Sequence, residues 1–422
     1  MTKEIYIFDK AAGGITRRRF AKTAIAGTAG LTLLHPLRFA GAQGAPLRIG
    51  VVLPLSGFQG LIGQACQVGA DLAPGIISDM GGPAVELVYA DTETNVDVAR
   101  TQTERLIRDG VDMIVGAFDS GATGAVAQVC EQNGTPLVIN IAADPAITQQ
   151  GYQYVYRNFP TAPTIVRNGL TAINALFETT GTTPQTAVFM HVNDTFGNAM
   201  AGGINALMPV VGVPYEVLDT ISYDPAARDL SVEVSRVRAL NPDLVLAVTR
   251  LNDAILLVRE MVRQRFEPMG FMSPGSPGMY ENQFYEALGP YSEYIATAIG
   301  WLDLNRPITQ ELESRFRESQ GEAVFEINVG FTFEAIQICA DAYARAGSND
   351  AGALVEALAA TDIAADDHPM IGGPIAFDEN GQNNNIGASL VQNRERRPRV
   401  IWPAESATME PVFPMPGWNE RT

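Results

Sequence analysis

Histidine, cysteine and lysine are scarce in this chain of 422 residues, which holds three of each. All three lysines lie within the first 22 residues, no run of basic residues follows them, and the formal net charge is −18. This charge argues against nucleic acid as a partner, because binding to phosphates depends on basic side chains. The chain also lacks a Gly-x-Ser-x-Gly motif, a P-loop and a metal-ligand spacing, so no motif predicts catalysis, a metal or a cofactor.

The three cysteines, Cys66, Cys130 and Cys339, are too few and too widely spaced to indicate a disulfide framework. Cys66 and Cys130 fall on the apolar faces of predicted helices, where a cysteine behaves as a small buried hydrophobe. We therefore expect free thiols. Two of the cysteines could still pair if the protein enters an oxidising compartment.

The first 42 residues have the features of an export signal. Residues Thr16–Lys22 resemble the twin-arginine motif, with Ala21 where leucine is usual, and an apolar segment and Ala40-Gly41-Ala42 follow. The apolar segment is too short for a membrane span, and no cysteine for a lipid anchor lies near the cleavage point. We expect cleavage near Ala42 and a free, monomeric protein in the periplasm. The alternative is a basic amphipathic N-terminus on a cytosolic protein.

From Arg48 onward, short apolar runs alternate with amphipathic helical patterns, as is typical of parallel sheets covered by helices on both faces. The alternation runs to Pro160, restarts after it and continues to about Ser273, which predicts two α/β lobes. The last third has too few strands for a third sheet, so we expect it to complete the first two lobes. The proline-rich tail from Pro411 is expected to be irregular.

One stretch, Met113–Val129, combines a short strand, a turn of small residues and a helix. This order places backbone N–H groups and the positive end of a helix dipole at the carboxyl edge of a sheet, where ligands of open α/β sheets bind. The turn around Ser120 would suit a carboxylate or another small acceptor. The alternative is an ordinary turn in which Ser120 is only the N-cap of the helix.

Several motifs, in a consistent order, make the chain resemble the leucine/isoleucine/valine-binding family of periplasmic solute-binding proteins. They are Arg48–Gly57, Gly116–Thr123, Ile141–Thr148, Tyr154–Arg157, Val192–Gly197 and Phe377–Gly381. The resemblance covers nearly all of residues 46–405. It implies the type I fold of this family, α/β with two Rossmann-like lobes of parallel sheets that are joined by three crossovers and close on a small ligand. Lobe 1 would comprise residues 46–160 and about 297–365, lobe 2 residues 161–296 and about 366–405, and residues 406–422 the tail.

The resemblance also implies a set of ligand-binding residues. Ser120 matches the serine that meets the ligand carboxylate, and Ile141 and Ala143 match backbone positions after the next strand. Ile62 stands where the first loop usually has an aromatic residue, although Phe58 could fill the same space. The full predicted set is Ser120, Gly121, Thr123, Ile141, Ala142, Ala143, Phe58, Ile62, Phe196, Asp194, Arg250 and Gly275.

This chain departs from the family pattern in the second lobe. Phe196 replaces a tyrosine and keeps a stacking face without the hydroxyl. Gly275 aligns with the acidic residue that holds the amine in amino-acid binders, and a buried ammonium without an anion is costly. Either the ligand has no amine, or an aspartate takes over: Asp194, Asp144 or Asp253. Arg250 could anchor a ligand carboxylate or pair with Asp253.

Three functions remain open at this point. The first is a solute receptor that delivers a branched-chain amino acid, or a related small carboxylate, amide or aromatic acid, to an ABC permease in the inner membrane. The second is a sensor module of the same fold. The third is an exported enzyme in which His191, at the end of a predicted strand, is catalytic. We expect the first, with no enzymatic activity.

Overall fold

The computed structural model describes residues 45–421, so the predicted export signal, with its cleavage point near Ala42, lies outside the described residues. Within 45–421, no helix has both the length and the apolar character needed to cross a membrane. All of these residues belong to one unit of the chain, which spans residues 37–422. Their strands form two sheets.

The first sheet has five parallel strands in the order β2-β1-β3-β4-β5. Their bounds are β1 (Leu47–Leu53), β2 (Val85–Asp91), β3 (Met113–Gly116), β4 (Leu137–Ile139) and β5 (Val155–Arg157). The central strands β1, β3 and β4 are almost wholly apolar and buried, as expected when helices cover both faces. Those helices are α2 (Gly60–Asp79), α3 (Val96–Arg108), α4 (Ser120–Asn133), α11 (Ile327–Ala346) and α12 (Ala351–Ala359).

The second sheet has seven strands in the order β12-β11-β10-β9-β8-β6-β7. Strands β6 to β10 pair in parallel, whereas β11 and β12 add two antiparallel pairs at one edge. The strands are β6 (Thr186–Val192), β7 (Glu216–Tyr223), β8 (Leu244–Val248), β9 (Gly270–Ser273), β10 (Ala296–Ile299), β11 (Ser389–Arg394) and β12 (Arg397–Trp402). The accompanying helices are α5 (Ala162–Thr180), α6 (Thr195–Val211), α7 (Ser231–Leu240), α8 (Leu251–Arg263) and α9 (Asn282–Leu288).

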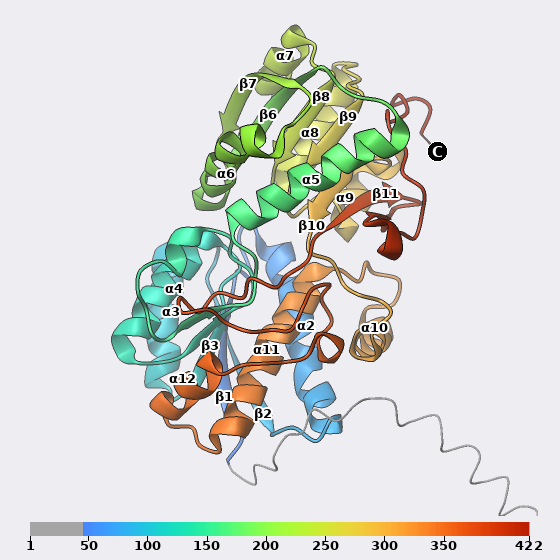
Figure 1. Cartoon of the computed structure of the whole chain (residues 1–422). Helices are drawn as coiled ribbons and strands as arrows, with labels where there is room; N and C mark the ends of the chain where they lie inside the picture. The colour runs from blue at the N-terminus through green and yellow to red at the C-terminus, as the bar shows by residue number, and fades with distance from the viewer. Residues whose placement is uncertain (1–44, 422) are drawn as a thin grey trace, which may run out of the picture. The chain divides into compact units, whose positions relative to one another are not determined.

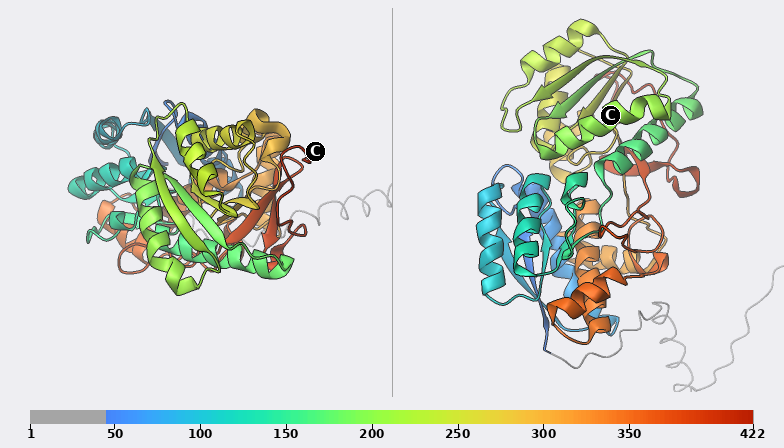
Figure 2. Two further views of the ribbon diagram at one scale, coloured as in Figure 1. Left: turned by 90° about the horizontal axis from the view of Figure 1, so that it is seen from above. Right: turned by 60° about the vertical axis from the view of Figure 1, so that its left-hand side comes forward.

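The last third of the chain returns to both sheets. Helix α11 packs against α2, and β11 pairs with β10. Figure 1 shows α11 and α12, in orange, beside the blue elements of the first sheet, and the right-hand view of Figure 2 shows the same grouping. The helix α10 (Pro307–Gln320) also contacts α2. The fold prediction of two parallel-dominated α/β lobes is therefore confirmed.

Hydrogen bonds suggest where the lobes divide. The predicted boundary at residue 297 falls inside β10, which bonds to strands of the second sheet on both sides. Residues after 366 still contact the first sheet, since the Arg157 amide donates to the Gly381 carbonyl at 2.7 Å. We therefore propose crossovers near residues 160, 300 and 388. The tail has little regular structure but packs on the second lobe, where the Met415 amide donates to the Met269 carbonyl at 2.8 Å.

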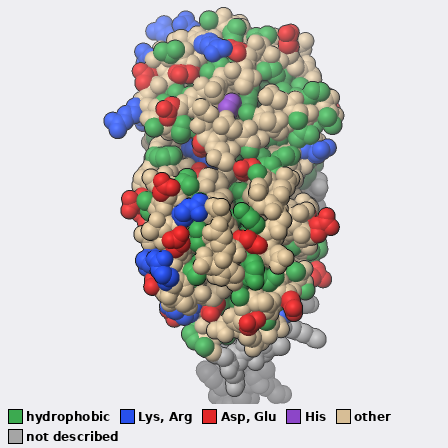
Figure 3. Space-filling view, turned by 90° about the vertical axis from the view of Figure 1, so that its left-hand side faces the viewer, with side chains coloured by type: hydrophobic (Ala, Val, Ile, Leu, Met, Phe, Trp, Pro, Cys, Tyr) green, Lys and Arg blue, Asp and Glu red, His purple; other side chains and the backbone are tan. Residues whose placement is uncertain are grey.

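The three cysteines are buried and unpaired. This agrees with the expectation of buried free thiols at Cys66 and Cys130. Burial raises the pKa of each thiol, which keeps it in the unreactive protonated form. On the face shown in Figure 3, acidic and basic side chains are interspersed over both lobes.

Candidate ligand-binding site

The turn between β3 and α4 is built differently from the prediction. The N-cap of α4 is Asp119, whose Oδ1 accepts hydrogen bonds from the amides of Gly121 (2.9 Å) and Ala122 (3.1 Å). Two of the first amides of the helix are therefore already occupied, and we correct the expectation that they face a ligand. Because Asp119 is the cap, Ser120 is free for another role. Its side chain is buried and its Oγ has no hydrogen-bond partner among residues 45–421.

Ser120 lines a small cavity between the two lobes. The cavity lies at the carboxyl ends of strands from both sheets, which is where an open α/β sheet binds its ligand. Its walls are mostly apolar and include three phenylalanines. The lining residues are Phe118, Ser120, Ile141, Ala142, Ala143, Phe159, Ile165, Phe196, Arg250, Gly275, Pro277, Tyr280, Ile299, Ile327 and Asn328.

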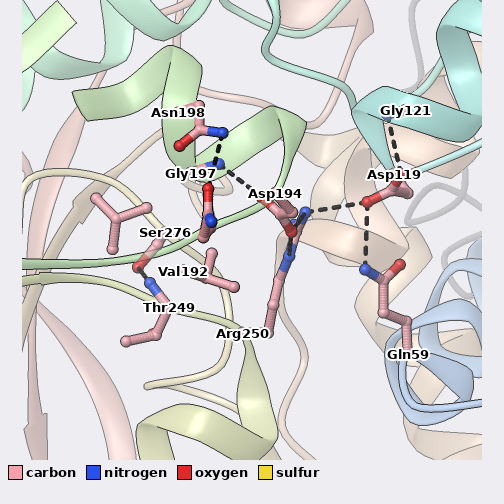
Figure 4. Close-up of polar contacts among 12 residues, drawn as sticks. Gln59, Asp119, Gly121, Val192, Asp194, Gly197, Asn198, Thr249, Arg250 and Ser276 are labelled. Atoms are coloured by element: carbon pink, nitrogen blue, oxygen red, sulfur yellow. Dashed lines mark hydrogen bonds and ion pairs between the residues drawn. The ribbon is translucent and has the colours of Figure 1, made fainter. Parts of the chain in front are cut away.

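Arg250, which follows β8, forms the charged part of the wall. Its Nη2 lies 2.9 Å from Asp194 Oδ2 in the same lobe and 3.1 Å from Asp119 Oδ2 in the other lobe. Figure 4 shows the guanidinium between these two carboxylates, with Gln59 beside Asp119. The guanidinium also lies over the ring of Phe196, 4.5 Å from its centroid. Arg250 is thus an ion-pair bridge between the lobes at the edge of the cavity.

The positive charge of Arg250 is already neutralised within the protein, because two carboxylates pair with it. Burial alone would lower the pKa of Arg250, but Asp194 and Asp119 outweigh this effect and raise it. Asp253 accepts from the backbone amide of Arg250 at 2.8 Å and from the Tyr223 hydroxyl at 2.7 Å. Burial raises the pKa of Asp253 to about 6. Two roles were predicted for Arg250, anchoring a ligand carboxylate or pairing with Asp253. Neither includes the pairing that the structure shows, in which the side chain of Arg250 bonds to Asp194 and Asp119.

Seven residues of the predicted set line the cavity, and five do not. The seven are Ser120, Ile141, Ala142, Ala143, Phe196, Arg250 and Gly275. Of the others, Phe58 is 47% exposed and Ile62 is buried in the core on α2. Gly121 donates to the N-cap, and the Thr123 hydroxyl accepts from the Ala117 amide at 3.2 Å. Asp194 reaches the cavity only through Arg250.

The structure explains why no acidic residue occupies position 275. The backbone of Gly275 has φ +132°, which disfavours any residue with a side chain. A Cβ there would lie 2.0 Å from Ile165 Cγ2, so the side chain would clash with α5. Here α5 occupies the space that an amine-binding carboxylate would need.

Eight lining residues were missed by the sequence analysis: Phe118, Phe159, Ile165, Pro277, Tyr280, Ile299, Ile327 and Asn328. Pro277 and Tyr280 lie within or just after the loop of small residues that contains Gly275, so that loop was a usable signal. Ile327 and Asn328 come from the first turn of α11, which reaches the cavity only because the last third of the chain packs back on lobe 1. No local pattern in the sequence indicates this return to the site.

Two buried glutamates lie next to cavity residues. Glu281 follows Tyr280 in lobe 2, and Glu326 precedes Ile327 in lobe 1. Both line a second pocket at the junction of the lobes. Burial, and then the neighbouring Glu326, raise the pKa of Glu281 to about 8. Burial raises the pKa of Glu326 to about 7. Near neutral pH Glu281 is therefore mostly protonated, whereas Glu326 is protonated only in part.

His191 does not line the cavity. It is buried at the end of β6, with Nδ1 3.1 Å from the Val192 carbonyl and its ring stacked 5.5 Å from that of Phe189. Its contacts are those of a packed side chain. Among the described residues, no group of three or more His, Cys, Asp or Glu side chains could hold a metal ion.

Comparisons with known proteins agree with this architecture. The model of the family described as periplasmic binding protein matches residues 46–394. The Leu/Ile/Val-binding protein homolog 1 of Brucella suis is 23% identical over 332 residues, which are 78% of this chain and 86% of that protein.

Two solved structures share the fold at low identity. The branched-chain amino acid transporter substrate-binding protein of Streptococcus pneumoniae, in complex with isoleucine, has a TM-score of 0.72 and 18% identity, covering 87% of this chain and all of that one. A solute-binding protein of an ABC transporter from R. palustris, in complex with benzoate, has a TM-score of 0.72 and 20% identity, covering 85% of this chain and 96% of that one.

Proposed function

Because this chain belongs to the periplasmic binding protein family, we propose that it is the solute-binding subunit of an ABC importer. Its ligand is a small carboxylic acid with an apolar body and no amine, for which an aromatic acid is the first choice. The lobes close on this ligand, and the closed form is the one that a membrane permease recognises. The protein acts in the periplasm as a monomer after export by its twin-arginine segment, and it catalyses no reaction.

The observation that carries the ligand class is the absence of any carboxylate from the cavity lining described above. The three aspartates that could have held an amine are engaged elsewhere. Asp194 pairs with Arg250, Asp253 bonds to Tyr223, and Asp144 accepts from the Ala146 amide at 3.0 Å. An ammonium group in this cavity would be buried without an anion, which is costly.

The remaining groups suit an acid with an apolar body. Phe118, Phe159 and Phe196 offer apolar walls, and the unpartnered hydroxyl of Ser120 can donate to a carboxylate oxygen. The complexes of similar proteins with benzoate and with 3,4-dihydroxybenzoic acid support an aromatic acid. The relatives named for leucine, isoleucine and valine favour a branched-chain amino acid as the second candidate.

A thermal-shift screen separates the two ligand classes, since a ligand raises the melting temperature by mass action. Benzoate and its simple derivatives should stabilise the protein, whereas leucine, isoleucine and valine should not. Strong stabilisation by leucine would overturn the argument from the missing carboxylate. A lack of stabilisation by every acid and amino acid tested would count against the binding site itself.

Ser120→Ala tests where the carboxylate binds. Loss of a hydrogen bond to a charged group should weaken binding of the stabilising acid by about 1–3 kcal/mol. Ser389→Ala is the matched control, because the Ser389 hydroxyl is also buried and unpartnered but does not line the cavity. Isothermal titration calorimetry should detect the loss in the first variant alone. Equal affinities for both variants would remove Ser120 from the site.

A further inference from the structure

Two further polar residues, Tyr280 and Asn328, line the cavity, and their side-chain polar groups have no hydrogen-bond partner among residues 45–421. Tyr280 and Asn328 are 0% and 1% exposed. Neither the Tyr280 hydroxyl nor the Asn328 carboxamide, through Nδ2 or Oδ1, makes a hydrogen bond to any of residues 45–421. A buried polar group without a partner is destabilising, because it has lost its hydrogen bonds to water. Three such atoms in one small cavity point to a molecule that supplies the missing hydrogen bonds.

Tyr280 is held firmly in lobe 2. The Gly278 amide donates to Glu281 Oε1 at 2.9 Å, which closes the turn around Tyr280. Gly278 has φ +98°, and a Cβ there would lie 2.6 Å from the backbone of Arg250, so only glycine lets this loop pack so closely. The ring of Tyr280 meets Trp301 edge to face at 5.3 Å. The hydroxyl is therefore fixed in place before a ligand binds.

Asn328 is held equally firmly, but in lobe 1. It lies in the first turn of α11, where Glu326 is the N-cap and accepts from the Asn328 amide at 2.7 Å. This bond uses the backbone amide of Asn328. The carboxamide lies near enough to Glu326 to lower the pKa of that carboxyl, but it makes no hydrogen bond of normal geometry. Glu326 also lies close enough to Tyr280 for its charge to raise the pKa of the phenol, after the larger effect of burial. The two polar side chains therefore share one neighbourhood although they belong to different lobes.

The surroundings of this pair favour a neutral partner. Glu281 and Glu326 lie close to Tyr280, and their raised pKa values reduce their negative charge near neutral pH. They offer a reduced negative charge to an ammonium group, and Arg250, the cation of the cavity, is already paired with Asp194 and Asp119. A hydroxyl both donates and accepts, and so do the phenol and the carboxamide.

We propose that Tyr280 and Asn328 bind a hydroxyl group of the ligand, apart from the carboxylate that Ser120 binds. The ligand is then a hydroxy-substituted acid with an apolar, aromatic body, and the hydroxyl joins the two lobes in the closed form. This inference rests on the proposed function. It adds a second recognition point, which distinguishes a hydroxylated acid from an unsubstituted or methylated acid of similar size.

Calorimetry with matched acids tests the inference. The probes are benzoate, 3- and 4-hydroxybenzoate, and 3- and 4-methylbenzoate, because a methyl group has nearly the size of a hydroxyl but cannot hydrogen-bond. At least one hydroxybenzoate should bind about tenfold tighter than its methyl counterpart, since one hydrogen bond to otherwise unpaired buried groups is worth about that factor. Tyr280→Phe and Asn328→Leu should each reduce this preference at least fivefold.

Tyr215→Phe is the matched control. The Tyr215 hydroxyl is also buried and unpartnered, but Tyr215 packs against Phe177 and does not line the cavity. It should leave the preference unchanged. If the methylbenzoates bind as tightly as the hydroxybenzoates, or if Tyr280→Phe keeps the full preference, the inference is wrong while the proposed function stands. If none of the five acids binds the unaltered protein, both are wrong.

Discussion

Replacing Asp119 with asparagine separates the two roles of this side chain. Oδ1 caps α4 through the amides of Gly121 and Ala122, whereas Oδ2 accepts from Arg250 across the cleft at 3.1 Å and from Gln59 at 3.2 Å. Asparagine is as good an N-cap as aspartate, so the helix should keep its first turn. The side-chain nitrogen of the asparagine would then face two donors, Arg250 and Gln59, in place of a carboxylate oxygen. The ion pair between the lobes would be lost.

The size of the effect follows from burial. A buried hydrogen bond to a charged group is worth about 1.5–3 kcal/mol, but the side chain of Asp119 is 21% exposed and Arg250 keeps its pair with Asp194. We therefore expect a loss of about 1–2 kcal/mol, which corresponds to a roughly 5–30-fold shift from the closed to the open form. Affinity for the best-binding acid of the thermal-shift screen should fall by the same factor, because tight binding requires closure.

Asp194→Asn is the matched control for this prediction. In the native protein Asp194 Oδ1 caps α6 by accepting from the Gly197 amide at 2.7 Å, and asparagine can keep this bond. The ion pair with Arg250 inside lobe 2 is lost. Arg250 would then interact with Asp119 alone, so closure and affinity should be kept or strengthened. Calorimetry with both variants decides the matter. Unchanged affinity in Asp119→Asn together with a loss in Asp194→Asn would refute the idea of a bridge between the lobes.

Three further predictions concern stability and reactivity. The free energy of unfolding in urea should fall as the pH rises from about 5 to 8. Folding raises the pKa of Glu281 from 4.5 to about 8 and that of Glu326 to about 7, so the folded protein holds protons that the unfolded chain has released. Glu281→Gln should flatten this decline, and a stability that rises with pH would contradict the prediction. The three buried thiols should resist a thiol reagent in the native protein and react fully in denaturant, as mass spectrometry can count. Trp418→Ala should lower the free energy of unfolding by about 3–5 kcal/mol, because this tail side chain is buried and donates to the Phe266 carbonyl at 2.7 Å. A loss below 1 kcal/mol would mean that the tail adds little to the stability of the fold.

The sequence was most informative where local patterns set the structure. The alternation of apolar runs and helical patterns predicted both sheets. The strand, turn and helix around Ser120 led to the cavity. Local rules could not decide between Asp119 and Ser120 as the cap, because both residue types are good N-caps.

The sequence was least informative where distant segments meet. Asn328 enters the cavity through the packing of α11 on α2, and the contact of Asp119 with Arg250 joins residues 131 positions apart. Neither contact leaves a periodic or compositional pattern in the sequence. The absence of an acid at Gly275 was visible in the sequence, but its cause, the close approach of Ile165 on α5, was not.

The unpartnered groups of the cavity also indicate how a ligand drives closure without chemistry. In an empty closed cavity, Ser120, Tyr280 and Asn328 each carry the cost of a buried polar group without a partner, about 1–3 kcal/mol. Opening the lobes would hydrate them and remove that cost, whereas the bridge from Arg250 to Asp119 acts in the opposite direction and favours closure. A ligand that bonds to all three groups removes the cost in the closed form alone, so it shifts the equilibrium by its differential affinity for that form. An acid of the same size that leaves Tyr280 and Asn328 unpaired gains less free energy from closure. The atoms that select the ligand are therefore the same atoms that set the population of the closed state.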